Sequence, residues 1–467
     1  MATTGDARRN EFSISTLLLL SLSIVVVVVF LLPVSSAGET SSFFNHRKMS
    51  AVGTSSNSTY AVIFDAGSSG SRVHVFHFDR NLDLLFIGSD IEVFSQIKPG
   101  LSSYADDPQK AADSLIPLLE KAEIAVPEKL QSVTPIRLGA TAGLRFLEGD
   151  RSERILEAVR NLLKTKSGFM YGADSVSILD GNQEGSYQWL TVNYLLENLG
   201  KRYSNTVGVI DLGGGSVQMA YAISDEDAAK APISSDGYSK FVQKFYLKGA
   251  NYYLYVHSYL RYGLQAARVE ILKVTEELGN PCILAGYQGT YAYGGKEYKA
   301  SSPRSGSSFA RCRSVILEAL NINKSCGYND CSFDGVWSGG GGAGVKNLYV
   351  ASFFFDKAAQ AGFIDSDKPD AMVKPIDFKR AARIACQTKF VDAKAKYPNV
   401  YSSDLQFVCM DLVYEYTLLV DGFGIDSRKS ITLVKQVAYH GSLAEAAWPL
   451  GNAVAIASSP KYSTATY

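Results

Sequence analysis

Several features that would identify a function at once are missing from this sequence. Lys plus Arg number 46, which equals Asp plus Glu, and no basic run occurs, so composition argues against a general nucleic-acid-binding protein. No G-x-x-x-x-G-K-[ST] motif is present, which excludes P-loop chemistry. No C-x-x-C pair and no H-E-x-x-H motif occurs, and the five histidines show no ligand spacing, which argues against a zinc site. His74 and His77 are interpreted as structural.

Apolar runs long enough for a targeting or membrane segment are also scarce, and the N-terminus carries the single candidate. Two arginines precede the apolar residues 17–32, and the small residues 35–37 follow. This order is typical of a secretory signal. Its length fits both a cleaved peptide and an uncleaved anchor, and both remain open. We expect a signal over residues 1–37, a polar linker over 38–58, and a secretory-pathway protein that is either secreted or anchored by one N-terminal membrane segment.

Cysteine is absent from the first half of the chain. Behind a secretory signal, an even number of cysteines is typical of disulfides, although the sequence alone does not resolve how they pair. Asn57 and Asn323 begin glycosylation acceptor sequences, which fits the same compartment. The six cysteines are Cys282, Cys312, Cys326, Cys331, Cys386 and Cys409.

Short β-branched runs alternate with helical patterns from residue 60 onward. Such alternation predicts an α/β fold. At about 100–200 residues per domain, the 467 residues suggest two or three domains. The expected strands span residues 60–64, 133–138, 176–179 and 206–210, and the expected helices span 108–125, 152–164 and 184–196.

One internal repeat stands out. An apolar strand ends in Asp65-Ala66-Gly67, and another ends in Asp211-Leu212-Gly213. Each is followed by a turn of small residues and a returning strand, over residues 72–78 and 217–223. A repeat of this kind suggests two related lobes that face each other.

The repeated turns are suited to phosphate binding. Glycine allows a tight turn whose successive N–H groups hold phosphate oxygens, and serine hydroxyls add donors. Asp65 and Asp211 could hold a hydrated divalent cation beside the phosphates. Thr141 lies in another small-residue turn, which could serve phosphate binding or helix–sheet packing. Glu184 opens a helix, where it is either a favourable charge at the helix N-terminus or a general base.

These residues resemble the nucleoside triphosphate diphosphohydrolase (apyrase) family, and within it the plant apyrases. Five segments carry the resemblance, in the family's order and spacing, and the similarity runs from about residue 60 to 457. The segments are residues 64–78, 138–147, 179–194, 210–222 and 444–451.

The resemblance implies an actin-like (ribonuclease H-like) two-lobed fold with the nucleotide in the cleft. Lobe I would comprise residues 59–180 plus 436–460, and lobe II residues 181–435. Glu184 would activate water, Asp65 and Asp211 would hold Ca²⁺ or Mg²⁺ through its water shell, and Trp448 would lie near the metal. The phosphates would be bound by Ser68, Ser69, Gly70, Ser71, Thr141, Gly213, Gly214, Gly215, Ser216 and Gln218.

The resemblance also implies a base clamp and a disulfide pattern. The aromatic clamp falls at Phe353, Phe354, Phe355 and Tyr414, which is a looser match. The family pairing joins Cys282 with Cys312, Cys326 with Cys331, and Cys386 with Cys409. Many membrane-bound relatives have a second span at the C-terminus, which is missing here.

The expected reaction is hydrolysis of nucleoside tri- and diphosphates to the monophosphate by in-line attack of water. A sugar kinase or chaperone-type ATPase of the same superfamily is a rival, against which the secretory signal, the cysteines and Glu184 count. A binding protein that retains the nucleotide fold is a second rival, but Asp65, Glu184 and Asp211 are all present. An additional binding role, for instance toward carbohydrate, stays open.

Overall fold

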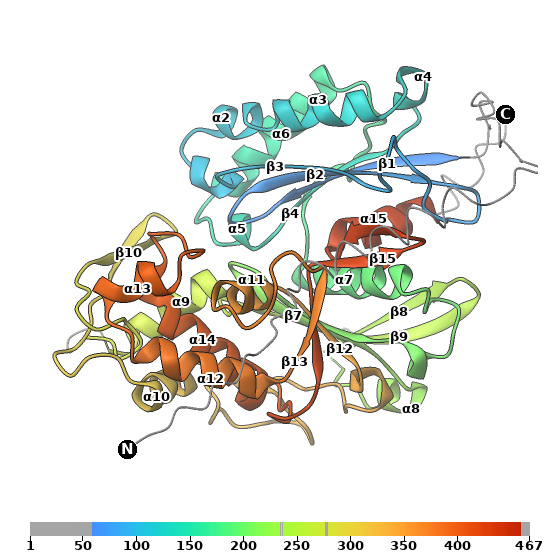
Figure 1. Ribbon diagram of the computed structural model, residues 1–467. Helices are drawn as coiled ribbons and strands as arrows, with labels where there is room; N and C mark the ends of the chain where they lie inside the picture. Colours follow the sequence, from blue (N-terminus) through green and yellow to red (C-terminus); the bar gives the residue numbers. More distant parts are fainter. Residues whose placement is uncertain (1–57, 234, 236, 276–278, 459–467) are drawn as a thin grey trace, which may run out of the picture. The chain divides into compact units, whose positions relative to one another are not determined.

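Two β-sheets of related topology organise the chain (Figure 1). The computed structural model describes residues 58–233, 235, 237–275 and 279–458. The expected signal, nearly all of the expected linker and Asn57 lie outside these residues. Among the described helices, none is both long and apolar enough to cross a lipid bilayer.

The first sheet is five-stranded, in the order β3-β2-β1-β4-β5. β1 pairs antiparallel with β2 and parallel with β4. We call the part of the chain built on this sheet lobe I. Its strands are β1 (Thr59–Ala66), β2 (Ser71–Phe78), β3 (Val93–Ile97), β4 (Ile136–Ala140) and β5 (Val176–Ile178).

The second sheet is seven-stranded, in the order β13-β14-β12-β6-β7-β9-β8, and carries lobe II. β6 pairs antiparallel with β7 and parallel with β12, which repeats the arrangement around β1. The internal repeat in the sequence is therefore also a repeat in topology. The strands are β6 (Gly208–Leu212), β7 (Ser216–Ile223), β8 (Val242–Leu247), β9 (Ala250–Leu260), β12 (Leu348–Ser352), β13 (Asp370–Val373) and β14 (Ile431–Val434).

Helices cover both sheets and lie between them (Figure 1). α7 and α15 share one apolar core with residues of both sheets, so they join the lobes. In lobe I the helices are α2 (Pro108–Asp113), α3 (Ile116–Ala125), α4 (Glu128–Gln131), α5 (Ala142–Arg145) and α6 (Arg151–Lys166). The joining helices are α7 (Gly181–Leu195) and α15 (Trp448–Ala457). In lobe II they are α8 (Asp225–Ala229), α9 (Leu264–Lys273), α10 (Phe309–Ala319), α11 (Phe353–Gln360), α12 (Pro375–Cys386), α13 (Phe390–Lys396) and α14 (Val408–Thr417).

Two small hairpins complete the regular structure. One consists of β10 (Thr290–Tyr293) and β11 (Lys296–Lys299), and the other of β15 (Gln436–Tyr439) and β16 (Ser442–Glu445). The second hairpin leads from lobe II directly into α15.

The α/β prediction is confirmed, but one helix prediction is wrong. Residues 108–125 form two helices, α2 and α3, instead of one. Pro117 lies in the first turn of α3. Proline has no N–H to donate to the carbonyl four residues earlier, but it is tolerated where a helix begins. The chain therefore breaks and restarts at this point.

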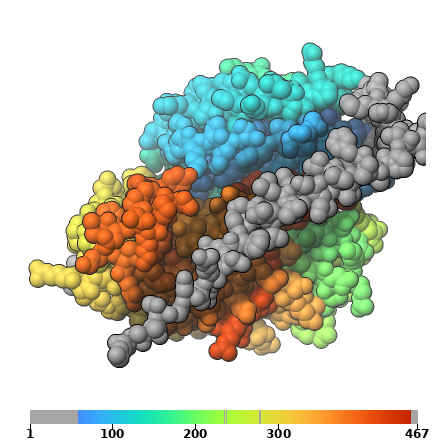
Figure 2. All heavy atoms as spheres, in the orientation of Figure 1, coloured from blue at the N-terminus to red at the C-terminus, as the bar shows by residue number. Residues whose placement is uncertain are grey.

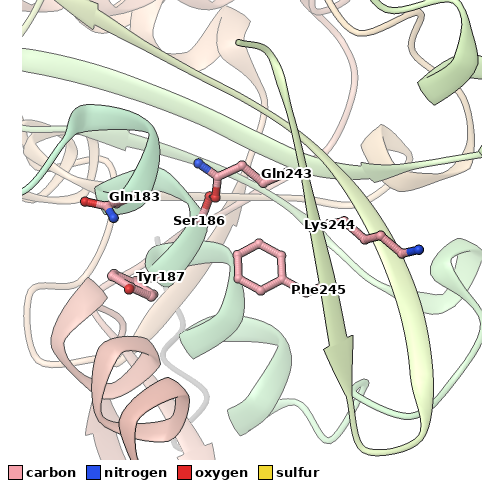
Figure 3. Close-up of a pocket in the computed structure, with 6 residues that line it drawn as sticks. All are labelled: Gln183, Ser186, Tyr187, Gln243, Lys244 and Phe245. Atoms are coloured by element: carbon pink, nitrogen blue, oxygen red, sulfur yellow. The ribbon is translucent and has the colours of Figure 1, made fainter. Parts of the chain in front are cut away.

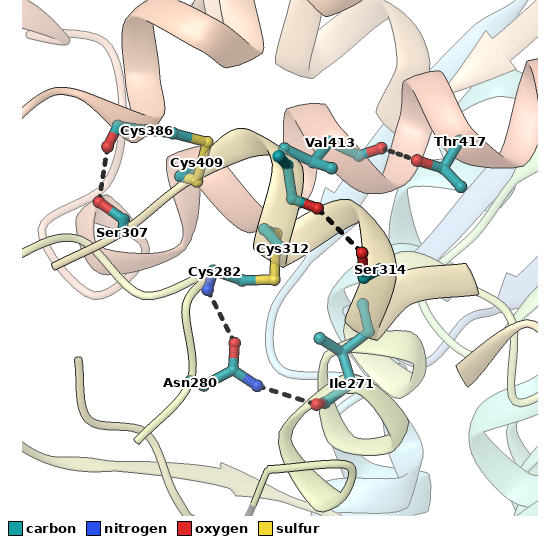
Figure 4. Close-up of a disulfide and its surroundings, with 11 residues drawn as sticks. Ile271, Asn280, Cys282, Ser307, Cys312, Ser314, Cys386, Cys409, Val413 and Thr417 are labelled. Carbon is teal, nitrogen blue, oxygen red and sulfur yellow. Dashed lines mark hydrogen bonds between the residues drawn. A yellow bond between two sulfur atoms is a disulfide. The ribbon is translucent and has the colours of Figure 1, made fainter. Parts of the chain in front are cut away.

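Three disulfides cross-link lobe II, with the pairing that the resemblance implied. They join Cys282 to Cys312, Cys326 to Cys331, and Cys386 to Cys409. Figure 4 shows two of them within a network of local hydrogen bonds. Asn280 accepts from the backbone N–H of Cys282 and donates to the carbonyl of Ile271, so the first disulfide is tied to α9.

Candidate active site

The two Asp-x-Gly turns meet at the end of the sheets, where Gly214 of lobe II lies against Ser68 of lobe I. A Cβ on Gly214 would meet the Ser68 side chain, and a Cβ on Gly143 would lie 2.8 Å from Ser68 Cα. Gly214 is therefore explained by the close approach of the lobe I and lobe II turns, and Gly143 by the close packing of α5 on the Ser68 turn within lobe I.

The lobe II turn is held so that its N–H groups stay free. At the start of α9, Leu264 N–H donates to Gly213 O at 2.9 Å and Gln265 N–H donates to Gly214 O at 3.0 Å. The N–H groups of Gly214 and Gly215 have no acceptor among the described residues. Free, consecutive N–H groups in a fixed turn form an anion-binding concavity.

Asp65 ends β1 opposite Arg72 of β2, and only 8% of the residue is exposed. Arg72 Nη1 donates to Asp65 Oδ2 at 3.0 Å. The other oxygen, Oδ1, is buried and has no hydrogen-bond partner among the described residues. A buried carboxylate oxygen without a donor is unusual, so this atom is a candidate cation ligand.

Asp211 occupies the matching place on β6 and is equally buried, at 8% exposed. Ser352, at the end of the parallel strand β12, donates to Asp211 Oδ1 at 2.5 Å. The pKa of Asp211 is raised to about 6, mainly by burial and also by Asp65, while the Ser352 hydrogen bond and Arg72 oppose the shift.

Glu184 lies in the first turn of α7, where a capping box closes the helix start around Asp180 and Gln183. The Glu184 residue is 9% exposed. Its Oε2 accepts from Arg145 Nη2 at 2.5 Å, and Gln218 Nε2 lies 3.4 Å away. Glu184 is thus held by groups from both lobes, which an incidental glutamate at a helix N-terminus would not require.

Opposing influences set the pKa of Glu184. Burial raises the pKa of Glu184 to about 8, Arg145 lowers it, and the negative charges of Asp211 and Asp65 raise it. Perturbed acids of this kind cluster at functional sites. A carboxyl group that titrates near neutral pH can exchange protons with water, as a general base must.

The remaining predicted residues lie around this centre. Gln218 Nε2 also contacts the hydroxyls of Ser216 at 2.7 Å and Ser258 at 2.9 Å. Thr141 is buried at the start of α5, and its N–H donates to Ala66 O at 3.1 Å. Trp448 packs its ring over Gly139, where a Cβ would lie 2.7 Å from the indole. The structure therefore brings together the residues predicted to bind phosphate, to bind a cation and to act as the general base.

Most of the aromatic residues that were predicted to clamp the nucleotide base are buried. Phe354, Phe355 and Tyr414 are buried in the lobe II core, at 0%, 3% and 1% exposed. Tyr414 Oη donates to Tyr262 O at 2.5 Å. Phe353 is partly buried and packs against the same core. A base-binding role for these residues stays a prediction.

A pocket of about 430 Å³ lies beside α7 and contains none of the predicted site residues. Figure 3 shows its lining, with Gln183, Ser186 and Tyr187 on α7 facing Gln243 and Phe245 on β8. Ser186 Oγ donates to Gln243 Oε1 at 2.8 Å. Because Glu184 does not line this pocket, we place the chemistry at the paired turns instead.

His74, one of the two histidines interpreted as structural, lies beside two carboxyl groups. His74 on β2 is 1% exposed, and its Nδ1 lies 2.6 Å from Glu92 Oε1 and 3.8 Å from Glu445 Oε2. Glu92 also accepts from the backbone N–H of Glu445 at 2.9 Å. The cluster ties β16 to the first sheet next to α15.

Sequence reasoning gave no role to four residues that shape the site. Arg72, Arg145 and Ser352 each contact a predicted catalytic or cation-binding carboxylate. Ser258 contacts Gln218. Arg72 and Arg145 lie within the segments that carry the resemblance, so a search for cations beside the essential carboxylates could have found them. Ser258 and Ser352 had no such signal.

Comparisons with known proteins agree with this geometry. The model of the GDA1/CD39 (nucleoside phosphatase) family matches residues 51–465. The chain is 58% identical over 400 residues to "Probable apyrase 2" of Oryza sativa subsp. japonica, covering 85% of this chain and 86% of that one. It is 54% identical over 412 residues to "Nucleoside-triphosphatase" of Pisum sativum, covering 88% and 90%.

The fold agrees as well. A nucleoside triphosphate hydrolase structure from Neospora caninum superposes with a TM-score of 0.60 at 14% identity, covering 85% of this chain and 92% of that one. At this identity the match establishes the two-lobed α/β fold alone. On the extent of the family match, the chain belongs to the GDA1/CD39 (nucleoside phosphatase) family.

Proposed function

We propose that this protein is an apyrase, which hydrolyses nucleoside tri- and diphosphates to the monophosphate and phosphate. The observation that carries the proposal is Glu184, a buried carboxylate held by Arg145 beside the two Asp-x-Gly turns. The names of the relatives, apyrase and nucleoside-triphosphatase, support the same activity.

Glu184 acts as the general base. It orients a water molecule and takes its proton as the water attacks the terminal phosphorus in line with the leaving oxygen. Arg145 favours the ionised form that this role requires, because its charge lowers the pKa of Glu184 against the effect of burial. No covalent intermediate is needed.

The turns bind the phosphates. Hydrogen-bond donors stabilise the negative charge on the transferring phosphoryl group. They are the free N–H groups of Gly214 and Gly215 and the hydroxyls of Ser68, Ser69 and Ser71. Because such donors are fixed before the substrate arrives, little reorganisation accompanies the reaction. The Gln218 amide orders Ser216 and lies beside Glu184.

Asp65 and Asp211 fit a divalent cation. Both carboxylates are buried, and Asp65 Oδ1 has no donor among the described residues. Hard carboxylate oxygens suit calcium and magnesium. When bound, such a cation supplies positive charge to the phosphate oxygens.

The decisive experiment is phosphate release from ATP, ADP and AMP by purified protein, with and without EDTA. We expect release from ATP and ADP, none from AMP, loss of activity in EDTA, and recovery on addition of calcium or magnesium. Undiminished hydrolysis in EDTA would show that Asp65 and Asp211 are misassigned. An absence of release from both ATP and ADP would refute the function.

The substrate range should be broad. The phosphate contacts are independent of the base, and the candidate base contacts are aromatic, so stacking accepts any base. Phe353, Phe354, Phe355 and Tyr414 stay candidates, of which Phe353 is the least buried. Steady-state kinetics with ATP, GTP, UTP, ADP and UDP test this. A preference above about 10⁴-fold in kcat/KM would indicate hydrogen-bonded readout of one base instead.

The protein belongs to the secretory pathway on this proposal. The cross-links that place all six cysteines in disulfides are typical of an oxidising compartment. Whether the N-terminal segment is cleaved or retained as an anchor is decided by N-terminal sequencing of protein from its native source. A carbohydrate-binding role is a separate proposal, testable by glycan binding of catalytically inactive protein.

A further inference from the structure

The hairpin formed by β10 and β11 belongs to lobe II and reaches lobe I beside the phosphate turns. Tyr291 Oη donates to Gln265 O at 3.0 Å, and the Tyr291 ring lies 5.1 Å from the Phe407 ring, so the base of the hairpin is fixed to lobe II. Its tip contains Gly294 and Gly295, both with positive φ, as a tight two-residue turn requires.

Two contacts cross from this hairpin to lobe I. The Tyr293 ring meets the Phe146 ring edge to face, with 6.2 Å between centroids and 72° between planes. Lys296 Nζ lies 3.3 Å from Glu148 Oε1, but both side chains are largely exposed. Exposed ion pairs contribute little, so the aromatic pair is the stronger contact. Tyr293 ends β10 and Phe146 directly follows α5, and Figure 1 labels both elements.

Phe146 also touches the lobe II phosphate turn. A Cβ on Gly215 would lie 2.6 Å from Phe146 Cε2 and 3.4 Å from Tyr293 Oη. Phe146 is therefore enclosed between Gly215 and Tyr293, although it belongs to lobe I. In Figure 2 the first part of lobe I is blue to cyan, and the residues near 300, which include the hairpin, are yellow.

The residue before Phe146 is Arg145, which binds Glu184. A displacement of Phe146 would move the backbone that carries Arg145 and would also loosen the contact with Gly215. The pair of Tyr293 and Phe146 therefore lies beside Arg145, which orients the proposed general base, and beside Gly215, which is proposed to bind phosphate.

We propose that Tyr293 is a positioning residue, whose ring holds Phe146 against Gly215 and so keeps Arg145 on Glu184 and the two phosphate turns in register. The inference rests on the proposed role of Glu184. The ring of Tyr293 carries this role, because it is the ring that packs edge to face on Phe146.

The test is steady-state kinetics of ATP hydrolysis by the full-length protein. We expect Tyr293→Ala and Phe146→Ala each to lower kcat by about 10- to 100-fold with KM changed by less than about threefold, since small misplacements near the chemistry carry costs of this size. The double variant should be no slower than the slower single variant, because both remove one contact.

Conservative and control variants separate positioning from a loss of folding. Tyr293→Phe keeps the ring and should recover most of the turnover, and Tyr293→Leu should recover part. Tyr298→Ala changes the same hairpin but removes a ring whose neighbour is Lys273 in lobe II, and it should leave kcat unchanged. Thermal melts confirm that each variant is folded.

The outcomes are distinct. Unchanged kcat in folded Tyr293→Ala, or fully additive losses in the double variant, would overturn the positioning role. An equally slow Tyr293→Phe would also overturn it and assign the effect to the hydroxyl. Normal turnover by Glu184→Gln would refute the proposed function on which the inference rests, whatever Tyr293 does.

Discussion

Two buried charge clusters differ in how their charges are balanced. At the site, three carboxylates (Asp65, Asp211 and Glu184) face two arginines (Arg72 and Arg145). Burial and mutual repulsion raise the pKa of both Asp211 and Glu184, to about 6 and about 8. The cluster carries an excess of negative charge whenever all three carboxylates are ionised.

The second cluster lies among α9, α11 and α14 of lobe II. Arg268 makes a bidentate pair with Asp411, at 2.9 and 2.7 Å, and binds Asp404 at 2.8 Å. Lys357 Nζ lies 3.1 Å from Asp411. Burial alone would raise the pKa of Asp411, but Arg268 and Lys357 together lower it below its ordinary value.

The third carboxyl group of this second cluster, Glu415, is different. It is 0% exposed with no hydrogen-bond partner among the described residues, and burial raises its pKa well above the ordinary value. A neutral Glu415 leaves two cations facing two anions. The structural cluster therefore stays compensated near neutral pH, whereas the site gains an unmet negative charge when Glu184 ionises, and this charge suits a divalent cation.

The largest expected effect is that of Glu184→Gln. Loss of a general base lowers kcat by about 10²–10⁴-fold. The free energy of unfolding should not fall, because burial and repulsion by Asp211 and Asp65 together outweigh the attraction of Arg145 and disfavour the carboxylate in the folded protein. Single-turnover hydrolysis and urea unfolding measure the two quantities. Near-normal turnover would remove Glu184 from the mechanism.

Asp411→Asn tests the compensated cluster and should show the opposite behaviour. It leaves Arg268 and Lys357 buried with too little negative charge, which costs about 3–5 kcal/mol in the free energy of unfolding. Asp404→Asn, at a position that is partly exposed, should cost less. The contrast fails if Asp411→Asn is as stable as the unsubstituted protein.

A smaller effect is expected from Arg145→Met, and it concerns pH. The charge of Arg145 lowers the pKa of Glu184, so its removal raises that pKa above about 8. Glu184 is then ionised only at higher pH, and the acidic limb of the plot of kcat against pH moves to higher pH. Arg145→Lys keeps the charge and should move the limb less. A limb that stays in place or moves to lower pH would contradict the role of Arg145.

Several features of the site could be predicted from the sequence, and others could not. The Asp-x-Gly turns are short, local and repeated, so they predicted both the topology and the pair of carboxylates. Glu184 was recognised only through the resemblance, because its partner Arg145 lies 39 positions away and no local pattern links them.

Features set by long-range packing were the least predictable. The compensated cluster gathers Arg268, Lys357 and Asp411 from three separate helices. Phe354 and Tyr414 were expected to contact the nucleotide base, but in the structure they fill the lobe II core. An aromatic residue that packs in a core and one that stacks on a ligand look alike in the sequence, since both are apolar positions on a helix.

The most direct test of the uncompensated site is the number of protons released when it binds a cation. At pH 7, Glu184 with a pKa of about 8 is mostly protonated, and a cation held by Asp65 and Asp211 favours its ionised form. Calorimetric titration with calcium, in buffers of different ionisation enthalpy, gives this number. We predict release of nearly one proton by the unsubstituted protein and far less by Glu184→Gln, whereas equal release by the two proteins would contradict the account.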